Sequence, residues 1–185
     1  MQKIRLIFIL MTSFAVFQLY GRSNSFLSEN NSGVMTYENE TIDHLNVNGV
    51  ANLKRTTVQN FLQVNGCLNA TGAFIKKMHV NGDATLENCS VDQNSTICGF
   101  LNATNSKFKN KLSIASEKVI FIDCTINDLQ ILKTSNVNKP QIIELKGKTK
   151  VNGSIVFEQE NGEVFLSKDS TIAPLLKGGK IKKVD

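Results

Sequence analysis

Residues 45–53 read LNVNGVANL, residues 62–70 read LQVNGCLNA, and residues 78–86 read MHVNGDATL. The central glycines of these units, followed by Gly99, are 17, 16 and 17 positions apart. Ser116 and Lys133 continue the spacing after the glycine is lost. A repeat this short is typical of architectures in which each unit buries its apolar side only against the next unit. The repeat therefore predicts a solenoid.

Apolar residues alternate on both sides of each central glycine, as in Leu45, Val47, Ala51 and Leu53. Alternation with period two indicates a strand with one buried face. The Asn-Gly pair between the two runs indicates a bend, because both residues tolerate positive φ. A further pair follows in each unit, and its first member is always small. These pairs are Thr56 and Val58, Ala73 and Ile75, Cys89 and Val91, Ser106 and Phe108, and Cys124 and Ile126.

Three short strands per turn of about 17 residues predict an all-β fold, a single-stranded parallel β-helix or β-solenoid, and we expect a right-handed one. Stacked turns of such a fold pair in parallel, with roughly 4.8 Å between strands. The main alternative is the left-handed solenoid built from hexapeptides. It repeats in sixes and has about 18 residues per turn, which spacings of 17, 16 and 17 do not follow.

The organisation of the chain follows from this repeat. Lys3 and Arg5 precede an apolar run, so residues 1–25 resemble a secretory signal whose cleavage site is not evident. Residues 26–44 are polar and acidic, and we expect a cap or linker there. Residues 45–175 are predicted to form the solenoid, interrupted at residues 134–141, and residues 176–185 a basic tail.

Several residues have predicted structural roles. Asn48, Asn65 and Asn81 precede glycines in one column, where amide side chains can hydrogen-bond along the stack. Cys89 and Cys124 share another column two turns apart, roughly 9–10 Å by the strand spacing. A disulfide needs Cα atoms within about 7 Å, so all four cysteines are predicted to be free. The complete structural set is Asn48, Gly49, Asn65, Gly66, Asn81, Gly82, Gly99, Cys89, Cys124, Asn152 and Gly153.

No cluster of residues indicates catalysis, a cofactor, a metal or a small-molecule substrate. His44 and His79 are the only histidines, and no zinc-binding spacing occurs. The acidic residues that a polysaccharide-active enzyme would need to cluster are scattered over different columns. They are Asp83, Glu87, Asp92, Asp123 and Asp128. The formal net charge is +5, but the body is nearly neutral and has no alternating aromatic and basic residues, so we predict no binding of nucleic acid.

Two lysine trios alternate with other residues: Lys107, Lys109 and Lys111, and Lys146, Lys148 and Lys150. Period two places each trio on one outward strand face, where charge discourages lateral strand pairing. The alternative interpretation is a candidate contact with an anionic surface, such as lipid headgroups or an acidic glycan.

The run Val151-Asn152-Gly153-Ser154-Ile155, like the earlier Val-Asn-Gly units, resembles the turns of bactofilins and the β-helical heads of some bacterial adhesin-like proteins. The resemblance covers roughly residues 45–172. Bactofilins are cytoplasmic filament formers with a right-handed β-helix, and this chain departs from them in its apparent export signal, its many asparagines and its interrupted middle.

The leading hypothesis is an exported, non-enzymatic β-solenoid, periplasmic or at the cell surface, that serves as a structural or binding module of a bacterial envelope. Its expected partners are copies of itself or an envelope glycan. The membrane becomes a partner only if the N-terminal segment stays uncleaved as an anchor. The alternatives are a bactofilin-like polymer and a polysaccharide-active β-helix enzyme.

Overall fold

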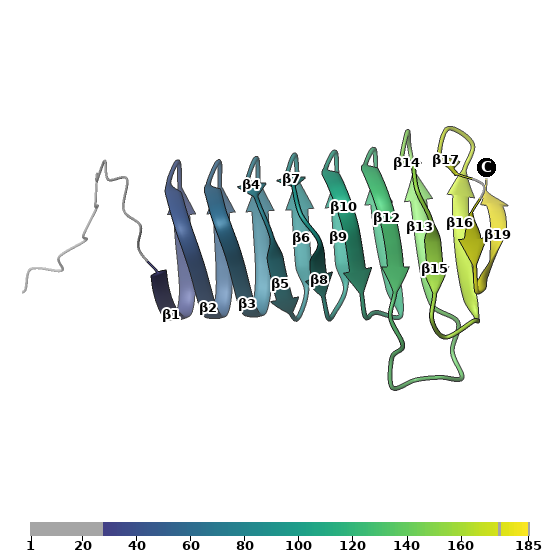
Figure 1. Cartoon of the computed structure of the whole chain (residues 1–185), viewed down its shortest axis with the longest axis horizontal. Helices are drawn as coiled ribbons and strands as arrows, with labels where there is room; N and C mark the ends of the chain where they lie inside the picture. Colours follow the sequence, from purple (N-terminus) through teal and green to yellow (C-terminus); the bar gives the residue numbers. More distant parts are fainter. Residues whose placement is uncertain (1–27, 174, 185) are drawn as a thin grey trace, which may run out of the picture.

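The computed structural model describes residues 28–173 and 175–184. They form a β-solenoid of about nine turns, in which every strand pairing is parallel and successive turns lie about 17 residues apart. Figure 1 shows the turns side by side along the long axis, from β1 at one end to β19 at the other. The predicted fold class is confirmed.

The strands belong to one continuous sheet. Their bounds are β1 Ser28–Glu38, β2 Thr41–Lys54, β3 Thr57–Thr71, β4 Phe74–Ile75, β5 Met78–Asn81, β6 Ala84–Glu87, β7 Ser90–Val91, β8 Ser95–Ile97, β9 Leu101–Thr104, β10 Lys107–Ile114, β11 Lys118–Ile122, β12 Thr125–Ile131, β13 Ile142–Lys146, β14 Lys150–Val151, β15 Ile155–Phe157, β16 Gly162–Ser167, β17 Thr171–Ile172, β18 Leu176–Lys177 and β19 Gly179–Val184.

Each complete turn has three strand segments, which we name from the second turn. The first segment is 45–47, the second is 51–53, and the third is 57–58. In the first segment Val47 pairs with Val64 and Val64 with Val80, and all three are fully buried. The parallel stacking predicted from the repeat therefore places these valines in one vertical row.

The second segment packs large against small side chains. Ala51 pairs with Leu68, Leu68 with Ala84, and Ala84 with Leu101. In the neighbouring inward column the order is reversed, since the same four turns contribute Leu53, Ala70, Leu86 and Ala103. All eight side chains are buried. Alternating large and small residues between turns fills the interior without voids.

The glycine corner joins the first and second segments. A Cβ added to Gly66 would lie 2.0 Å from the carbonyl oxygen of Gly49, and one added to Gly82 would lie 2.0 Å from that of Gly66. Both glycines also have positive φ, 140° and 145°. The column therefore needs glycine chiefly because stacked backbones approach each other here, in addition to the expected conformational freedom.

A second corner, between the second and third segments, was not predicted from the sequence. One residue there adopts a left-handed conformation, with φ between 48° and 64°, in seven successive turns. These residues are Asn39, Arg55, Gly72, Asn88, Asn105, Asp123 and Gly147. Asn, Asp and Gly accept this conformation most readily. The signal was present in the spacing of Asn39, Gly72, Asn88 and Asn105, but Arg55 obscures it.

From the second turn onward, the small residue just before the third segment is buried. The column consists of Thr56, Ala73, Cys89, Ser106, Cys124, Thr149 and Ser170. Their hydroxyl and thiol groups hydrogen-bond to nearby carbonyl groups; the Ser106 Oγ, for example, donates to the Thr104 carbonyl at 2.9 Å. All four cysteines are free thiols, as predicted, and Cys89 and Cys124 are buried.

The solenoid extends beyond both predicted boundaries. β1 pairs in register with β2 over its whole length, with Gly33 opposite Gly49, so residues 28–44 of the predicted cap or linker form a turn of their own. At the other end β19, assigned to the tail 176–185, pairs with β16. Here Ile181 continues the inward column of Val164, while lysines in the adjacent positions hid the strand pattern. The predicted signal at 1–25 lies outside the described residues.

Candidate functional site

The regular turns are interrupted at the glycine corner of the seventh turn. Four positions separate Ile97 from Leu101 and five separate Ile114 from Val119, but twelve separate Ile131 from Ile143. The extra residues form the loop 132–141, which projects from the shaft between β12 and β13 (Figure 1). This loop lies at the interruption that the sequence predicted. Loops held on rigid scaffolds often carry binding residues, so this is our candidate site.

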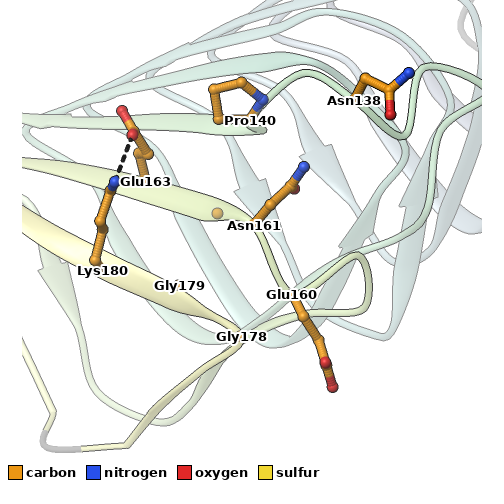
Figure 2. A pocket seen from close by; sticks show the side chains of 9 residues that line it. Asn138, Pro140, Glu160, Asn161, Glu163, Gly178, Gly179 and Lys180 are labelled. Atoms are coloured by element: carbon orange, nitrogen blue, oxygen red, sulfur yellow. Dashed lines mark ion pairs between the residues drawn. The ribbon is translucent and has the colours of Figure 1, made fainter.

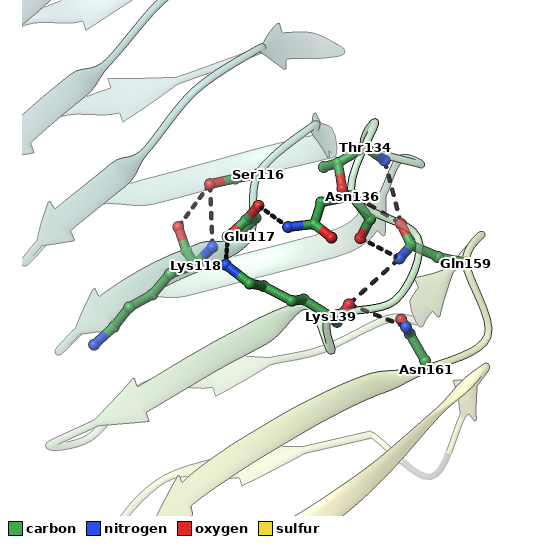
Figure 3. Close-up of polar contacts among 8 residues, drawn as sticks. All are labelled: Ser116, Glu117, Lys118, Thr134, Asn136, Lys139, Gln159 and Asn161. Carbon is green, nitrogen blue, oxygen red and sulfur yellow. Dashed lines mark hydrogen bonds and ion pairs between the residues drawn. The ribbon is translucent and has the colours of Figure 1, made fainter.

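The loop is attached to the turns on both sides of it (Figure 3). From the preceding turn, Glu117 Oε1 accepts a hydrogen bond from Asn136 Nδ2 at 3.1 Å. From the following turn, Gln159 Nε2 donates to the Asn136 carbonyl at 3.1 Å, and Asn161 Nδ2 donates to the carbonyls of Val137 and Lys139 at 3.2 and 3.0 Å. These bonds hold an exposed connection in one conformation.

The base of the loop is fixed inside the shaft by Gln141. This side chain is almost fully buried, and its Nε2 donates to the Ser116 carbonyl at 3.0 Å and to the Leu132 carbonyl at 2.8 Å. A buried amide that bonds two main-chain groups fixes both ends of the departure from the shaft. The loop therefore leaves and rejoins the solenoid at a defined place.

A groove of about 680 Å³ lies between the loop and the last turns (Figure 2). One wall comes from the loop, through Asn138 and Pro140, and the other from the strand ends at Glu163 and Lys180. The complete lining is Asn138, Pro140, Glu160, Asn161, Gly162, Glu163, Gly178, Gly179 and Lys180. Its volume is within the range of small-ligand sites, and polar and apolar surface contribute about equally to its lining.

Phe157 packs directly beneath the glycines that form the floor of the groove. This residue continues the inward column of Ile131, and its ring is buried at the glycine corner. A Cβ added to Gly162 would lie 2.2 Å from that ring, and one added to Gly179 would lie 2.8 Å from it. Both added Cβ atoms would point inward at the buried ring, so two successive turns have glycine here because Phe157 occupies the space that a side chain would need.

The charges in the groove are largely balanced. Lys180 and Lys182 form ion pairs with Glu163 at 3.1 and 2.6 Å. Hydrogen bonds from Lys182 and then Lys180 lower the pKa of the Glu163 carboxyl. Glu160 is exposed, and Figure 2 shows its side chain directed away from Glu163 and Asn161. The carboxylate nearest the floor is thus ionised and already paired.

Two amide groups at the groove retain unused hydrogen-bonding capacity. Asn161 Oδ1 is shielded from solvent and has no hydrogen-bond partner in the part of the chain that the structure describes. Asn138 is exposed on the loop side of the groove. Neither residue could be identified from the sequence, because neither belongs to the repeat.

The lysine trios do not lie on single strand faces. Lys107 is on the third segment, whereas Lys111 lies beyond the register shift that marks the following corner. Lys146 ends β13 and Lys150 begins β14, so the second trio passes around the left-handed corner. Period-two alternation fails as a guide where the chain bends. Lys109 pairs with Asp92 at 2.7 Å and Lys146 with Glu144 at 2.6 Å, so neither is a free cation.

The predicted asparagine ladder is present between its first two members, with Asn65 Nδ2 donating to Asn48 Oδ1 at 2.8 Å. Similar bonds occur in columns that were not predicted, from Asn69 to Asn52 and from Asn105 to Asn88. Asn152 and Gly153 lie elsewhere. Val151 pairs with Ile126 in the third segment, so this Val-Asn-Gly triplet turns the corner before the next first segment and not the glycine corner.

The scattered acidic residues bond to the following turn. Asp83 Oδ1 accepts from the Phe100 amide at 2.9 Å, Asp123 Oδ1 from the Lys148 amide at 2.8 Å, and Asp128 Oδ1 from the Ser154 amide at 2.8 Å. His44 Nδ1 lies 2.7 Å from Asp43 Oδ2. His79 pairs with Gln63 and Thr96 in an outward column. The three aspartate contacts tie neighbouring turns together at their corners.

Within residues 28–173 and 175–184, no three His, Cys, Asp or Glu side chains gather in a way that could hold a metal ion. The same residues include no helix with the length and apolar character required to cross a bilayer. No protein-family model matches the chain, and neither do curated proteins or solved structures.

Proposed function

We propose that the protein is an exported, non-enzymatic β-solenoid that serves as a structural or binding module of a bacterial envelope or surface, and that the groove beside loop 132–141 is its binding site. The observation that carries the proposal is the contrast between the two parts. In the turns before the seventh the glycine corner is short and repetitive, whereas in the seventh turn it holds an ordered polar loop beside a groove.

The shaft suits a scaffold. Each strand bonds to the turns before and after it, so the ladder of hydrogen bonds runs along the full length of the described solenoid. The inward columns form one continuous apolar core from Tyr37 to Val164. Such a stack is stiff, and it holds the loop at a fixed distance from the N-terminal end.

A role without catalysis is favoured by the use of the acidic side chains. Asp83, Asp123 and Asp128 each accept hydrogen bonds from the next turn, and Glu163 is held between two lysines. Glycoside hydrolysis needs two carboxyl groups about 5–10 Å apart that face one substrate. A degradation screen on envelope polysaccharides, with and without calcium, tests this alternative, and release of product would contradict our proposal.

The location is tested by fractionating cells and determining the N-terminal residue of the protein in each fraction. Export predicts protein in the periplasm, on the surface or in the medium, with a new N-terminus after residue 13 and before residue 28. Protein that is confined to the cytoplasm with Met1 retained would contradict export.

The binding site is tested by removing residues 133–139 from the full chain. The deletion shortens the path from Ile131 to Ile143 to five positions, as between Ile114 and Val119, so the solenoid should still form. We expect the purified variant to keep its circular dichroism spectrum but to lose co-sedimentation with isolated envelopes. If the variant co-sediments as well as the unmodified protein, the loop is not required for binding to envelopes.

A second candidate function, assembly into filaments, is favoured by opposite charges at the two ends. Among the described charged side chains near the two ends, the first turn has the acidic residues Glu38, Glu40 and Asp43, and the last has the basic residues Lys177, Lys180, Lys182 and Lys183. Head-to-tail contacts of this kind do not close and produce fibres.

Polar residues at inward register positions oppose that assembly. Asn31 pairs with Val47 in the first turn, and Lys183 pairs with Leu166 in the last. An inward charge on an edge strand discourages further pairing. Electron microscopy and sedimentation at low and high salt separate the two candidates, since salt-sensitive filaments would favour assembly over a discrete module.

A further inference from the structure

We propose that the groove between loop 132–141 and the last turns binds an uncharged saccharide unit of an envelope glycan. This inference rests on the proposed binding function and adds the chemical class of the ligand.

The charge balance disfavours ionic ligands. An anion in the groove would lie near Glu163 and Glu160, and a cation would meet Lys180. Because Glu163 already pairs with Lys180 and Lys182, entry of either kind of ion would weaken an existing ion pair. A neutral ligand leaves these pairs intact. Ion pairs that remain in place also present fixed donors and acceptors to hydroxyl groups.

The unused polar atoms match hydroxyl groups. Asn161 Oδ1 is an acceptor without a partner, and its amide nitrogen cannot turn away because it holds the Val137 and Lys139 carbonyls. Because this oxygen is shielded from solvent, a ligand O–H reaches it only if neighbouring atoms of the groove shift, and the bond would then satisfy a group that is costly to leave unpaired. Across the groove, the Asn138 amide offers both a donor and an acceptor, and a sugar ring carries both kinds of group.

The shape of the groove also suits a ring. Gly162 and Gly179 have no side chains above Phe157, and Pro140 contributes an apolar wall. The ligand would therefore lie over the exposed backbone of Gly179, with Pro140 at its side and amide groups at its rim. A volume of about 680 Å³ exceeds that of one sugar ring, so more than one unit of a chain fits.

The test uses the full chain, purified from the compartment where it accumulates, and titrates it with neutral tetrasaccharides by calorimetry and by protein NMR. The probes are chitotetraose, cellotetraose, maltotetraose and mannotetraose, with tetragalacturonate as the acidic comparison. The variants are Asn138→Ala at the groove and, as a matched control, Asn152→Ala, another exposed asparagine that lies at a different corner.

We expect at least one neutral tetrasaccharide to bind with millimolar or better affinity and little dependence on salt. Asn138→Ala should weaken it about fivefold to tenfold, the effect of one hydrogen bond, whereas Asn152→Ala should not. Failure of every neutral probe, or equal binding by the two variants, would overturn the proposal. So would salt-sensitive preference for tetragalacturonate.

The deletion of residues 133–139 distinguishes this inference from the proposed function. If the deletion abolishes binding to envelopes while no neutral tetrasaccharide binds or competes, the binding module stands and the saccharide assignment is wrong. If neutral tetrasaccharides bind at the groove but envelopes do not bind the protein, the assignment stands and the proposed envelope role is wrong.

Discussion

The Cα of Gly66 lies so close to the Gly49 main chain of the preceding turn that an added Cβ would be 2.0 Å from the carbonyl oxygen. No side-chain rotation can relieve this contact, because the backbone fixes the position of the Cβ and the carbonyl oxygen belongs to the main chain. We therefore predict that Gly66→Ala lowers the free energy of unfolding by about 3–5 kcal/mol, at the upper end of the range for single substitutions. Denaturant titration followed by circular dichroism measures the loss.

Gly72 provides the matched control for this prediction. It also has positive φ, 64°, but an added Cβ would meet only the Arg55 side chain, at 3.5 Å. Gly72→Ala should cost about 1–2 kcal/mol from backbone strain alone. Gly72→Asn should cost less, because Asn88 and Asn105 occupy the same column. Equal losses for Gly66→Ala and Gly72→Ala would show that close backbone approach is not the dominant constraint.

The buried thiols should make stability depend on pH in the alkaline range. Burial raises the pKa of Cys89 and of Cys124 above the ordinary value of 9.0. The unfolded chain then loses its thiol protons before the folded one does, so stability present below pH 9 falls as the pH rises further. Unfolding measurements between pH 7 and about pH 10 should show this decline.

Cys89→Ser tests the assignment, since Ser106 occupies the next position in the same column and makes an equivalent bond to a carbonyl group. This variant should fold and should reduce the alkaline decline. Alkylation offers an independent measurement, because exposed Cys67 should react in the native state while Cys89 and Cys124 should react only after unfolding. A pH profile unchanged by Cys89→Ser would contradict the thiol assignment.

An acidic counterpart is expected at Glu144, which pairs with Lys118 of the preceding turn and with Lys146 of its own strand, both at 2.6 Å. Hydrogen bonds from Lys118 and then Lys146 lower its pKa below the ordinary value. A depressed pKa contributes stability above about pH 4.5 that is lost as the pH falls through the folded pKa. Glu144→Gln should cost up to about 1 kcal/mol at neutral pH.

The same substitution should flatten the acid limb of the stability profile. Glu117→Gln is a suitable comparison, since Glu117 is more exposed and its ion pair with Lys139 is long, 3.9 Å. Thermal unfolding between pH 3 and pH 7 compares the two variants. An acid limb that is the same in Glu144→Gln and the unmodified protein would remove Glu144 as its source.

The repeat could be predicted from the sequence wherever an inward column is occupied by apolar residues of one kind. Val47, Val64 and Val80 show the register directly, and the interruption near Pro140 marks the loop. The end turns could not be predicted as easily, because polar residues replace apolar ones there. Asn31 and Lys183 stand at inward positions. The 16-residue spacing from Gly33 to Gly49 does continue the repeat, but the polar residues around Gly33 conceal it.

The groove was beyond prediction for a different reason. Its residues come from the loop and from two turns, and they share no spacing that an alternating pattern would reveal. Its floor depends on a contact between Phe157 and Gly162 that only the stacked geometry produces. For the two lysine trios the prediction was wrong for the opposite reason. Their spacing along the chain is regular, but the chain bends within each trio, so its members lie on different sides of a corner.

The contact between Phe157 and Gly162 leads to a last prediction, a coupling between two substitutions. Gly162→Ala alone should be strongly destabilising, because the new Cβ would lie 2.2 Å from the ring. Phe157→Leu alone should cost about 1–2 kcal/mol as the core loses volume. In the double variant the smaller side chain makes room for the Cβ. The double variant should therefore be at least about 1 kcal/mol more stable than the two separate losses predict. Denaturant unfolding of all four proteins measures this coupling, and additive losses would mean that the ring does not set the floor of the groove.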